Sequence, residues 1–461
     1  MKITTQLDYE VILANRACPV YFALHFEAPV IGSKARPKPA AFCLVLDRSG
    51  SMAGPPLTKA KQAALLAVRN LRPEDNFALV IFDHEAQVAI PFQPALKKAD
   101  FMRTIEGIES GGNTNLTGGW MLGRDEVKQA PAEASRRLLL LSDGLLNSGI
   151  IEPAAVRQVV MAGLELDRVR TSCLGFGANY NEDLMTTMAQ VSGGQFYDAD
   201  APEKFPAIFE SELEGLQKLA VQNLRVRLRR LDFCESLRPL GNYPAVARPE
   251  GWTEFFVGDL VSGESRVVCF QLDVLPLPWL AGRPVVSLEG ERLLEVEMAY
   301  DDLGEGEITS RTETRVMRIQ ATQNPAEVRQ KAEVIPWVAL QRAGQVIDQV
   351  TQLMDGGRVD EALVVLNQTI NSLKSYGPEA TVGEAVKQLE DLLGRLTSGE
   401  WSLRLRKLSK YRSHSYGRMS SSEHWSSGEP PPSFKPPRPQ PPIPPAPPVD
   451  PNNPPAGGTT A

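Results

Sequence analysis

Cysteine, histidine and long apolar segments are scarce in this 461-residue chain. The five cysteines are scattered, and none forms a C-x-x-C pair or stands beside a histidine, so a zinc site or a disulfide framework is not expected. No apolar run approaches the ~20 residues that a membrane-spanning helix needs. The N-terminus has no continuous apolar core of the kind found in secretory signals. We therefore expect a soluble protein of a reducing cytoplasm, without a membrane span.

The sequence also lacks the motifs of several enzyme classes. None of the four histidines stands where it would activate a serine or cysteine nucleophile, which leaves hydrolase chemistry little support. No G-x-x-x-x-G-K-[ST] loop is present, so the chain is not itself expected to be an NTPase.

Charge is distributed unevenly along the chain. The whole sequence carries 49 Lys or Arg and 56 acidic residues, a net charge of −7, which argues against a general nucleic-acid binder. Residues 401–461 differ, with eight basic and three acidic side chains and a net charge of +5. Proline occupies 15 of the 26 positions from 430 to 455, a composition that favours polyproline II over a packed core. We predict a basic, Ser-rich and Pro-rich disordered tail over 401–461.

Four continuous apolar runs are typical of strands that are buried on both faces of a parallel sheet. They lie at 40–47, 77–82, 136–143 and 169–177. Segments with helical periodicity fill most of the gaps, at 57–71, 95–109, 117–130, 152–166 and 181–191. This alternation predicts an α/β doubly wound, Rossmann-like domain over residues 38–218.

Three further regions flank this domain. Residues 219–322 contain short alternating runs separated by Gly and Pro, which predicts an antiparallel β-sandwich domain. Residues 1–37 hold strands that we expect to join that β-domain, so that the α/β domain is inserted between them. Residues 323–400 carry three amphipathic segments with short glycine-containing links, which indicates a small helical bundle.

The strongest chemical signal lies where the first buried strand ends. Asp47, Ser49 and Ser51 form a D-x-S-x-S pattern there, and a helix follows. A G-G-x-T loop then supplies Thr114, and a later apolar strand ends in S-D-G with Asp143. The carboxyl ends of strands in a doubly wound sheet converge on one edge, where such folds bind ligands. Two carboxylates and three hydroxyls are hard oxygen donors, so we expect them to bind Mg²⁺, Mn²⁺ or Ca²⁺.

These three loops resemble the metal-ion-dependent adhesion site of the von Willebrand factor A (VWA) domain, whose signature is D-x-S-x-S, then G-G-x-T, then a strand ending in S/T-D-G. The wider layout is similar to bacterial cytosolic VWA proteins that are related to the inter-α-trypsin-inhibitor heavy chains and are often called chloride-channel-like. The resemblance implies that Ser49, Ser51 and Thr114 ligate the metal through hydroxyls. It implies that Asp47 and Asp143 ligate directly or through water, and that a partner's Asp or Glu takes the remaining position.

Two nearby residues, Thr117 and His84, are alternative candidates for the site. Thr117 could replace Thr114, but the Gly-Gly spacing favours Thr114. His84 follows the second predicted strand beside Asp83, and we interpret it as a residue of a surface turn rather than of the site.

The leading functional interpretation is a non-enzymatic, metal-dependent protein-binding module that serves as a scaffold or regulator. One alternative is a metal-dependent phosphohydrolase or phosphotransferase that uses Asp47 as its nucleophile. The second acid that such enzymes carry two residues later is absent, because position 49 is Ser. A second alternative is a non-catalytic subunit of an AAA+ (chelatase-like) complex whose ATPase is encoded elsewhere. The tail offers serines after basic residues, at Ser409 and Ser420, for a kinase, and KPPRPQPPIPP for a polyproline-binding domain.

Overall fold

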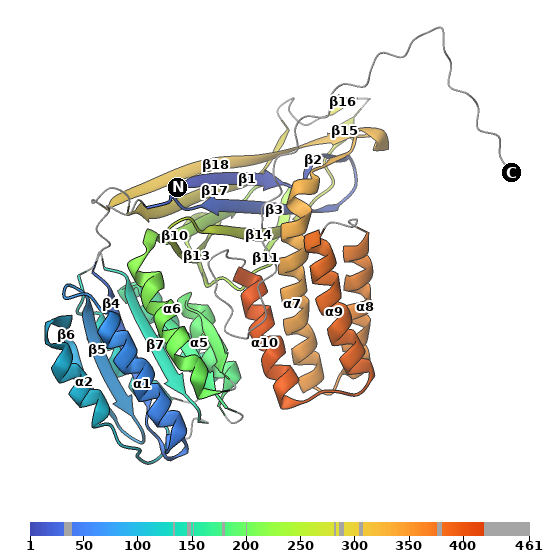
Figure 1. Cartoon of the computed structure of the whole chain (residues 1–461). Coiled ribbons are helices and arrows are strands. Elements are labelled where there is room, and N and C mark those ends of the chain that lie inside the picture. The colour runs from blue at the N-terminus through green and yellow to red at the C-terminus, as the bar shows by residue number, and fades with distance from the viewer. Residues whose placement is uncertain are drawn as a thin grey trace, which may run out of the picture.

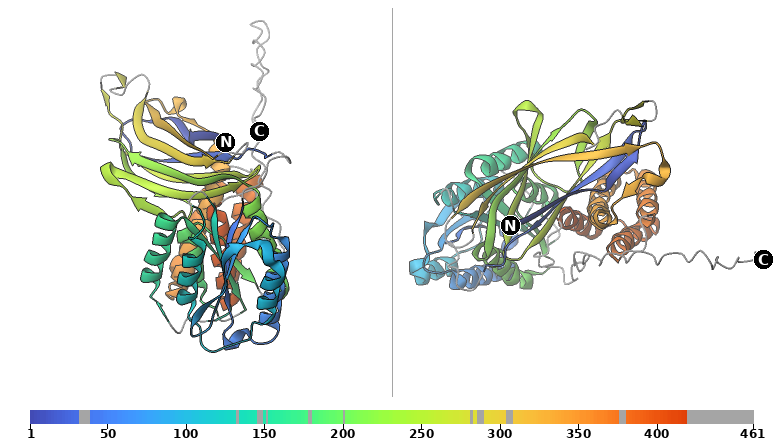
Figure 2. Two further views of the ribbon diagram at one scale, coloured as in Figure 1. Left: turned by 90° about the vertical axis from the view of Figure 1, so that its left-hand side faces the viewer. Right: turned by 90° about the horizontal axis from the view of Figure 1, so that it is seen from above.

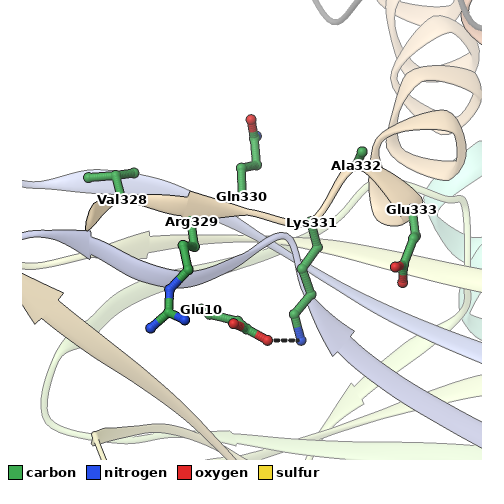
Figure 3. Close-up of a pocket in the computed structure, with 7 residues that line it drawn as sticks. All are labelled: Glu10, Val328, Arg329, Gln330, Lys331, Ala332 and Glu333. Carbon is green, nitrogen blue, oxygen red and sulfur yellow. Dashed lines mark ion pairs between the residues drawn. The ribbon is translucent and has the colours of Figure 1, made fainter. Parts of the chain in front are cut away.

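The structure is a computed structural model that describes residues 1–418 except for 32–38, 132–133, 145–148, 151, 178–179, 200, 281–282, 285–289, 304–307 and 376–379. Its described part comprises an α/β region, a pair of β-sheets stacked above it and a group of C-terminal helices beside it (Figures 1 and 2). The proline-rich segment of the predicted tail lies outside the described residues.

A six-stranded sheet with the order β6-β5-β4-β7-β8-β9 forms the centre of the α/β region. Neighbouring strands run parallel except for β6, which pairs antiparallel with β5. Every residue of β4 is buried, as its continuous apolar run predicts. The strands are β4 (Ala41–Asp47), β5 (Asn76–Phe82), β6 (Ala86–Pro94), β7 (Arg136–Ser142), β8 (Val169–Phe176) and β9 (Phe196–Ala199).

Helices cover both faces of this sheet. Phe42 and Leu44 of β4 pack with α1, α2 and α6, whereas Cys43 and Val45 pack with α3, α4 and α5, because successive side chains of a strand point to opposite faces. The predicted doubly wound α/β architecture is therefore confirmed, although antiparallel β6, the short strand β9 and helix α6 were not among the predicted segments. The helices are α1 (Pro55–Asn70), α2 (Lys98–Glu106), α3 (Leu116–Val127), α4 (Pro153–Asp167), α5 (Glu182–Ser192) and α6 (Phe205–Gln217).

Two further sheets share a second apolar core. One has the strand order β1-β3-β14-β11 and the other β12-β13-β10-β17-β18-β2-β19. The N-terminal strands pair with strands that follow the α/β region, β3 with β14 and β2 with β18. The strands are β1 (Lys2–Leu7), β2 (Tyr9–Leu13), β3 (Cys18–Glu27), β10 (Leu219–Arg230), β11 (Cys234–Pro239), β12 (Ala245–Ala247), β13 (Trp252–Val261), β14 (Ser265–Val274), β17 (Glu291–Asp302), β18 (Thr309–Thr322) and β19 (Arg329–Gln330), with a small hairpin of β15 (Trp279–Leu280) and β16 (Arg283–Pro284).

The C-terminal helices are α7 (Ile335–Asp355), α8 (Val359–Lys374), α9 (Ala380–Thr397) and α10 (Leu403–Arg418). They share a third apolar cluster, to which β3 contributes Tyr21 and Ala23 and β14 contributes Val267 and Cys269. The helices therefore cover the outer face of the four-stranded sheet. None of the helices within the described ranges is both long enough and apolar enough to cross a bilayer.

Helix α10 corrects the prediction that order ends at residue 400. Residues 403–418 are helical and contact both α7 and α5, so this helix joins the C-terminal helices to the α/β region. Tyr411 is buried in the α/β core and Tyr416 in the cluster of C-terminal helices. Ser409, predicted as a kinase site, is only 3% exposed.

The basic side chains of α10 explain why the prediction failed. Arg406 pairs with Asp355 at the end of α7 at 2.8 Å, and also with Glu182 and Asp183 at the start of α5. The Lys407 ammonium donates to the Gly177 carbonyl at 3.0 Å. A basic composition is typical of a solvated segment, but here the charges meet acidic residues that are distant in the sequence.

Candidate metal centre

The polar loops singled out in the sequence meet at the carboxyl edge of the α/β sheet. β4 ends at Asp47, and the neighbouring β7 ends at Ser142, immediately before Asp143. The parallel register pairs Leu46 with Leu141, so the two strands end side by side. The short 3-10 turn Gly50–Met52 follows β4 and leads into α1.

Asp47 lies at the bottom of this site and its side chain is fully buried. The Ser49 backbone N–H donates to Oδ1 at 2.8 Å, and the Ser142 hydroxyl donates to Oδ2 at 2.5 Å. Burial raises the pKa of Asp47 to about 6, although the hydrogen bonds from Ser142 and Ser49 act in the opposite direction. A carboxylate at this position is therefore costly to ionise unless a positive charge accompanies it.

Two hydroxyls connect Asp47 to the second acid. The hydroxyl oxygens of Ser49 and Ser51 are 3.1 Å apart, and the Ser51 hydroxyl donates to Oδ1 of Asp143 at 2.7 Å. Burial also raises the pKa of Asp143, with the Ser51 hydrogen bond acting against it. The structure thus brings together four of the five predicted residues through direct contacts.

Thr114 comes from the third loop, which is fixed against the first by backbone hydrogen bonds. The Gly50 N–H donates to the Gly112 carbonyl at 3.0 Å. A Cβ atom built on Gly144 would lie 3.0 Å from the Thr114 hydroxyl and 3.7 Å from the Ser51 hydroxyl, so both hydroxyls border the same small space. Thr117 is used elsewhere, since its hydroxyl accepts a hydrogen bond from the Ile150 N–H at 2.9 Å.

The donor set fits a small divalent cation. It offers two carboxylates and three neutral hydroxyls, all hard oxygen ligands. The described surroundings of Asp47 and Asp143 include no basic side chain that lowers either pKa. Among the described residues, no group of three or more His, Cys, Asp or Glu could hold a metal ion. A cation here would compensate one buried acid, Asp47, and one partly buried acid, Asp143.

Sequence reasoning missed two residues beside the site, Asp83 and Arg48. Asp83 directly follows β5 and pairs with the Arg48 guanidinium at 2.9 Å. Its burial would raise its pKa, but the Glu85 N–H, Arg48 and His84 outweigh burial and lower it. An acid that ends a buried strand next to the D-x-S-x-S strand is the signal that could have identified it. His84 is 62% exposed, as expected for a surface turn, yet it also borders Gly112 of the Thr114 loop.

The comparisons with known proteins agree with this geometry. Residues 42–211 match the family model of the von Willebrand factor type A domain. The chain therefore contains a VWA domain, and the family resemblance predicted from its motifs is confirmed. 

Relatives from bacteria and from human match different lengths of this chain. The Synechocystis sp. protein sll0103 is 26% identical over 337 residues, which cover 71% of this chain and 77% of that protein. YfbK of Escherichia coli is 26% identical over 234 residues, covering 50% of this chain but only 40% of its own length. The human inter-alpha-trypsin inhibitor heavy chain H3 is 30% identical over 203 residues, 41% of this chain and 22% of that one.

Two solved structures share the fold over most of the chain at low sequence identity. A von Willebrand factor type A protein from Catenulispora acidiphila has a TM-score of 0.67 at 16% identity and covers 86% of this chain and 88% of its own. The ArnB paralog VWA2 from Sulfolobus acidocaldarius has a TM-score of 0.60 at 16% identity and covers 90% of this chain and 98% of its own. At these identities the likeness shows a shared fold.

Proposed function

We propose that the VWA domain binds a divalent cation, Mg²⁺ or in its place Mn²⁺ or Ca²⁺, and presents it to a carboxylate of a protein partner. Asp47, Ser49, Ser51, Thr114 and Asp143 hold the ion in this proposal. The observation that carries it is the continuous chain of contacts from Asp47 to Asp143 through two hydroxyls, with Thr114 facing the same space. Only five residues of the chain are proposed as ligands, and Mg²⁺ prefers octahedral coordination, so a sixth position remains for an anionic ligand from the partner.

The flanking parts of the chain have a supporting role in this proposal. The two sheets that flank the VWA domain form a β-sandwich domain, and the C-terminal helices form a bundle. Both hold the VWA domain in a fixed position relative to the tail. We place the protein in the cytoplasm as a non-enzymatic scaffold or regulator. Participation in an AAA+ complex stays a prediction, as does binding of a polyproline-binding domain to the tail. The kinase prediction is now confined to Ser420, which lies outside the described residues, because Ser409 is buried.

The phosphotransfer alternative is less well supported. The Asp47 side chain is fully buried and both its oxygens accept hydrogen bonds, whereas an attacking carboxylate must reach a phosphoryl group. Measuring phosphate release from p-nitrophenyl phosphate with Mg²⁺ tests this directly. Turnover by the wild-type chain that Asp47→Asn abolishes would favour the enzyme over the binding module.

Metal binding is tested by titrating the full chain with Mg²⁺ or Mn²⁺ in a calorimeter. Thr114→Ala and Asp143→Ala should each lose measurable binding. Thr117→Ala is the matched control, because it removes a hydroxyl from the adjacent helix without removing a proposed ligand. Equal affinity of the Thr114 and Thr117 variants would show that Thr114 is not a ligand.

The partner's carboxylate is tested in a second step. Proteins retained by the immobilised full chain in Mg²⁺ are eluted with EDTA at constant ionic strength, and each is then titrated in purified form against wild-type and Thr114→Ala protein. A specific partner should bind the wild-type chain only with the ion, and should lose binding when one of its own Asp or Glu residues is replaced. Affinity that is the same with and without chelator would reduce the ion to a structural role.

A further inference from the structure

Asp83 lies between two of the three loops around the proposed cation site, the D-x-S-x-S loop and the loop that carries Thr114. It immediately follows β5, the strand next to β4, and its side chain is only 2% exposed. One carboxylate oxygen pairs with Arg48, which belongs to the D-x-S-x-S loop, at 2.9 Å. The other oxygen accepts from the Glu85 N–H at 3.0 Å and lies 2.9 Å from Nδ1 of His84. The carboxylate is thus fixed from several sides.

The same residue contacts the loop that carries Thr114. The Asp83 carbonyl accepts a hydrogen bond from the Asn115 N–H at 2.7 Å. A Cβ atom on Gly111 would lie 2.0 Å from the Asp83 carboxylate, so this carboxylate requires glycine at that position of the loop. Gly111 in turn donates its N–H to the Arg48 carbonyl at 2.6 Å.

These contacts place Thr114 between two attachments. Asn115, directly after it, is bound to the Asp83 backbone, and Gly111, three residues before it, is packed on the Asp83 side chain and bound to Arg48. Asp83 makes no contact of its own with the proposed ligand oxygens in the interactions described above. Its effect on the ion must therefore pass through the position of Thr114 and of the D-x-S-x-S loop.

We infer that Asp83, together with Arg48, is a positioning residue that fixes the Thr114 loop against the D-x-S-x-S loop and thereby sets cation affinity. This inference rests on the proposed function, because it assigns a supporting role around the cation site. Groups that orient metal ligands contribute strongly to binding, since a ligand that is free to move must be ordered when the ion arrives. A largely buried ion pair between the two loops provides that order before the ion binds.

The chain contains a close control for this residue. Asp75 stands at the other end of β5, is fully buried, and pairs with Arg72 at 2.6 Å. It also accepts a backbone hydrogen bond, from the Ala40 N–H at 2.8 Å. At 3.3 Å per residue the two acids are roughly 26 Å apart along the strand. Asp75→Asn therefore disturbs a similar buried pair in the same domain without touching the cation site.

The experiment measures Mg²⁺ affinity of the full chain by calorimetry and its melting temperature in EDTA. Asp83→Ala and Asp83→Asn should bind Mg²⁺ ~10–100-fold more weakly than the wild type. Asp75→Asn should lower the melting temperature in EDTA but keep Mg²⁺ affinity within about twofold, because distant sites act independently. Arg48→Met should weaken Mg²⁺ binding like Asp83→Asn, and it carries the test if an Asp83 variant does not fold.

A second measurement separates positioning from general destabilisation. Gly111→Ala should weaken Mg²⁺ binding, because its new methyl group collides with the Asp83 carboxylate. In the Asp83→Ala background that carboxylate is gone, so adding Gly111→Ala should change Mg²⁺ affinity little further. Additive losses in the double variant would contradict the proposed contact.

The possible outcomes distinguish this inference from the function on which it rests. Wild-type Mg²⁺ affinity in Asp83→Ala, Asp83→Asn and Arg48→Met would overturn the positioning role while leaving the cation site intact. Equal weakening by Asp75→Asn would also overturn it, since the effect would then follow general stability. Absence of Mg²⁺ binding by the wild-type chain and by Asp75→Asn alike would overturn the proposed function itself.

Discussion

Asp47→Asn should stabilise the metal-free protein and destabilise the metal-loaded one. Burial raises the pKa of this acid from 3.8 to about 6, so the folded state holds the proton more tightly than the unfolded state does. Stability is therefore lost as the pH rises from about 4 to about 6, and it stays lost at neutral pH. A shift of about two pKa units corresponds to about 3 kcal/mol at ~1.36 kcal/mol per unit.

Asparagine removes this cost while keeping the shape of the side chain. Its amide oxygen can still accept the Ser49 N–H, and the Ser142 hydroxyl can accept from its amide nitrogen. In EDTA at pH 7.5 we expect Asp47→Asn to be more stable than the wild type by about 1–3 kcal/mol, a rise of several degrees in melting temperature. At pH 4.5 most of the difference should disappear, because the wild-type acid is then protonated.

Addition of Mg²⁺ should reverse the order of the two proteins. At a concentration of 1,000 times its dissociation constant, a ligand stabilises the folded state by about 4.1 kcal/mol, which exceeds the cost of the buried charge. Only the wild type should gain this stabilisation. The buried carboxylate would then lower the stability of the metal-free protein and enable the protein to bind the ion. Functional residues often lower stability in this way.

Thermal unfolding of the full chain in EDTA and in Mg²⁺ provides the assay, with the transition of the VWA domain assigned by hydrogen exchange of β4. The metal-free comparison at pH 7.5 is decisive for the electrostatic argument. A variant that melts at or below the wild-type temperature there would refute the reasoning. Equal Mg²⁺ stabilisation of both proteins would refute the assignment of Asp47 as a ligand.

Other regions give independent tests. Burial raises the pKa of Asp8 to about 7, so the stability of the wild type should fall between pH 4 and pH 7, and Asp8→Asn should flatten that dependence in pH-resolved melting curves. Arg406→Met should free α10, seen as faster hydrogen exchange of 403–418, whereas Arg358→Met, which removes an exposed pair with Glu361, should not. Gly194→Ala should lower the free energy of unfolding by about 1–3 kcal/mol, because the new methyl group collides with the backbone of β8. Gly215→Ala in α6 meets nothing within 4 Å and should raise the free energy of unfolding by up to ~1 kcal/mol. Denaturant unfolding measures both.

Local sequence patterns predicted the α/β core because they report burial directly. A run such as 40–47 has no polar residue until Asp47, so it can only be a strand covered on both faces. The ends of such strands and the order of the loops then indicate where the sheet collects its polar groups. For this reason the sequence was sufficient to select Asp47, Ser51, Thr114 and Asp143 as neighbours, although they are spread over almost a hundred residues.

Elements whose burial depends on distant partners were not predictable in this way. Strand β6 lies at a sheet edge and runs antiparallel. Pro91 interrupts its short apolar run and disfavours a strand, and of its residues only Ile90 is buried. Helix α10 is basic, and its sequence alone resembles a solvated tail. Its pairs with acidic residues of α5 and α7 exist only in the tertiary structure, because those residues are distant in the sequence.

The cation site shows the same division between sequence and tertiary structure. The residue types and their spacing determined the proposed ligands, because an oxygen donor set can be read from the loops one at a time. The ion pair between Arg48 and Asp83 forms because strands β4 and β5 lie side by side. Glycine is required at position 111 because the Asp83 carboxylate packs against it. Such contacts join segments that are distant in the sequence, and neither segment's residue pattern indicates the other as its partner. Only the folded structure therefore decided how the ligand loops are held.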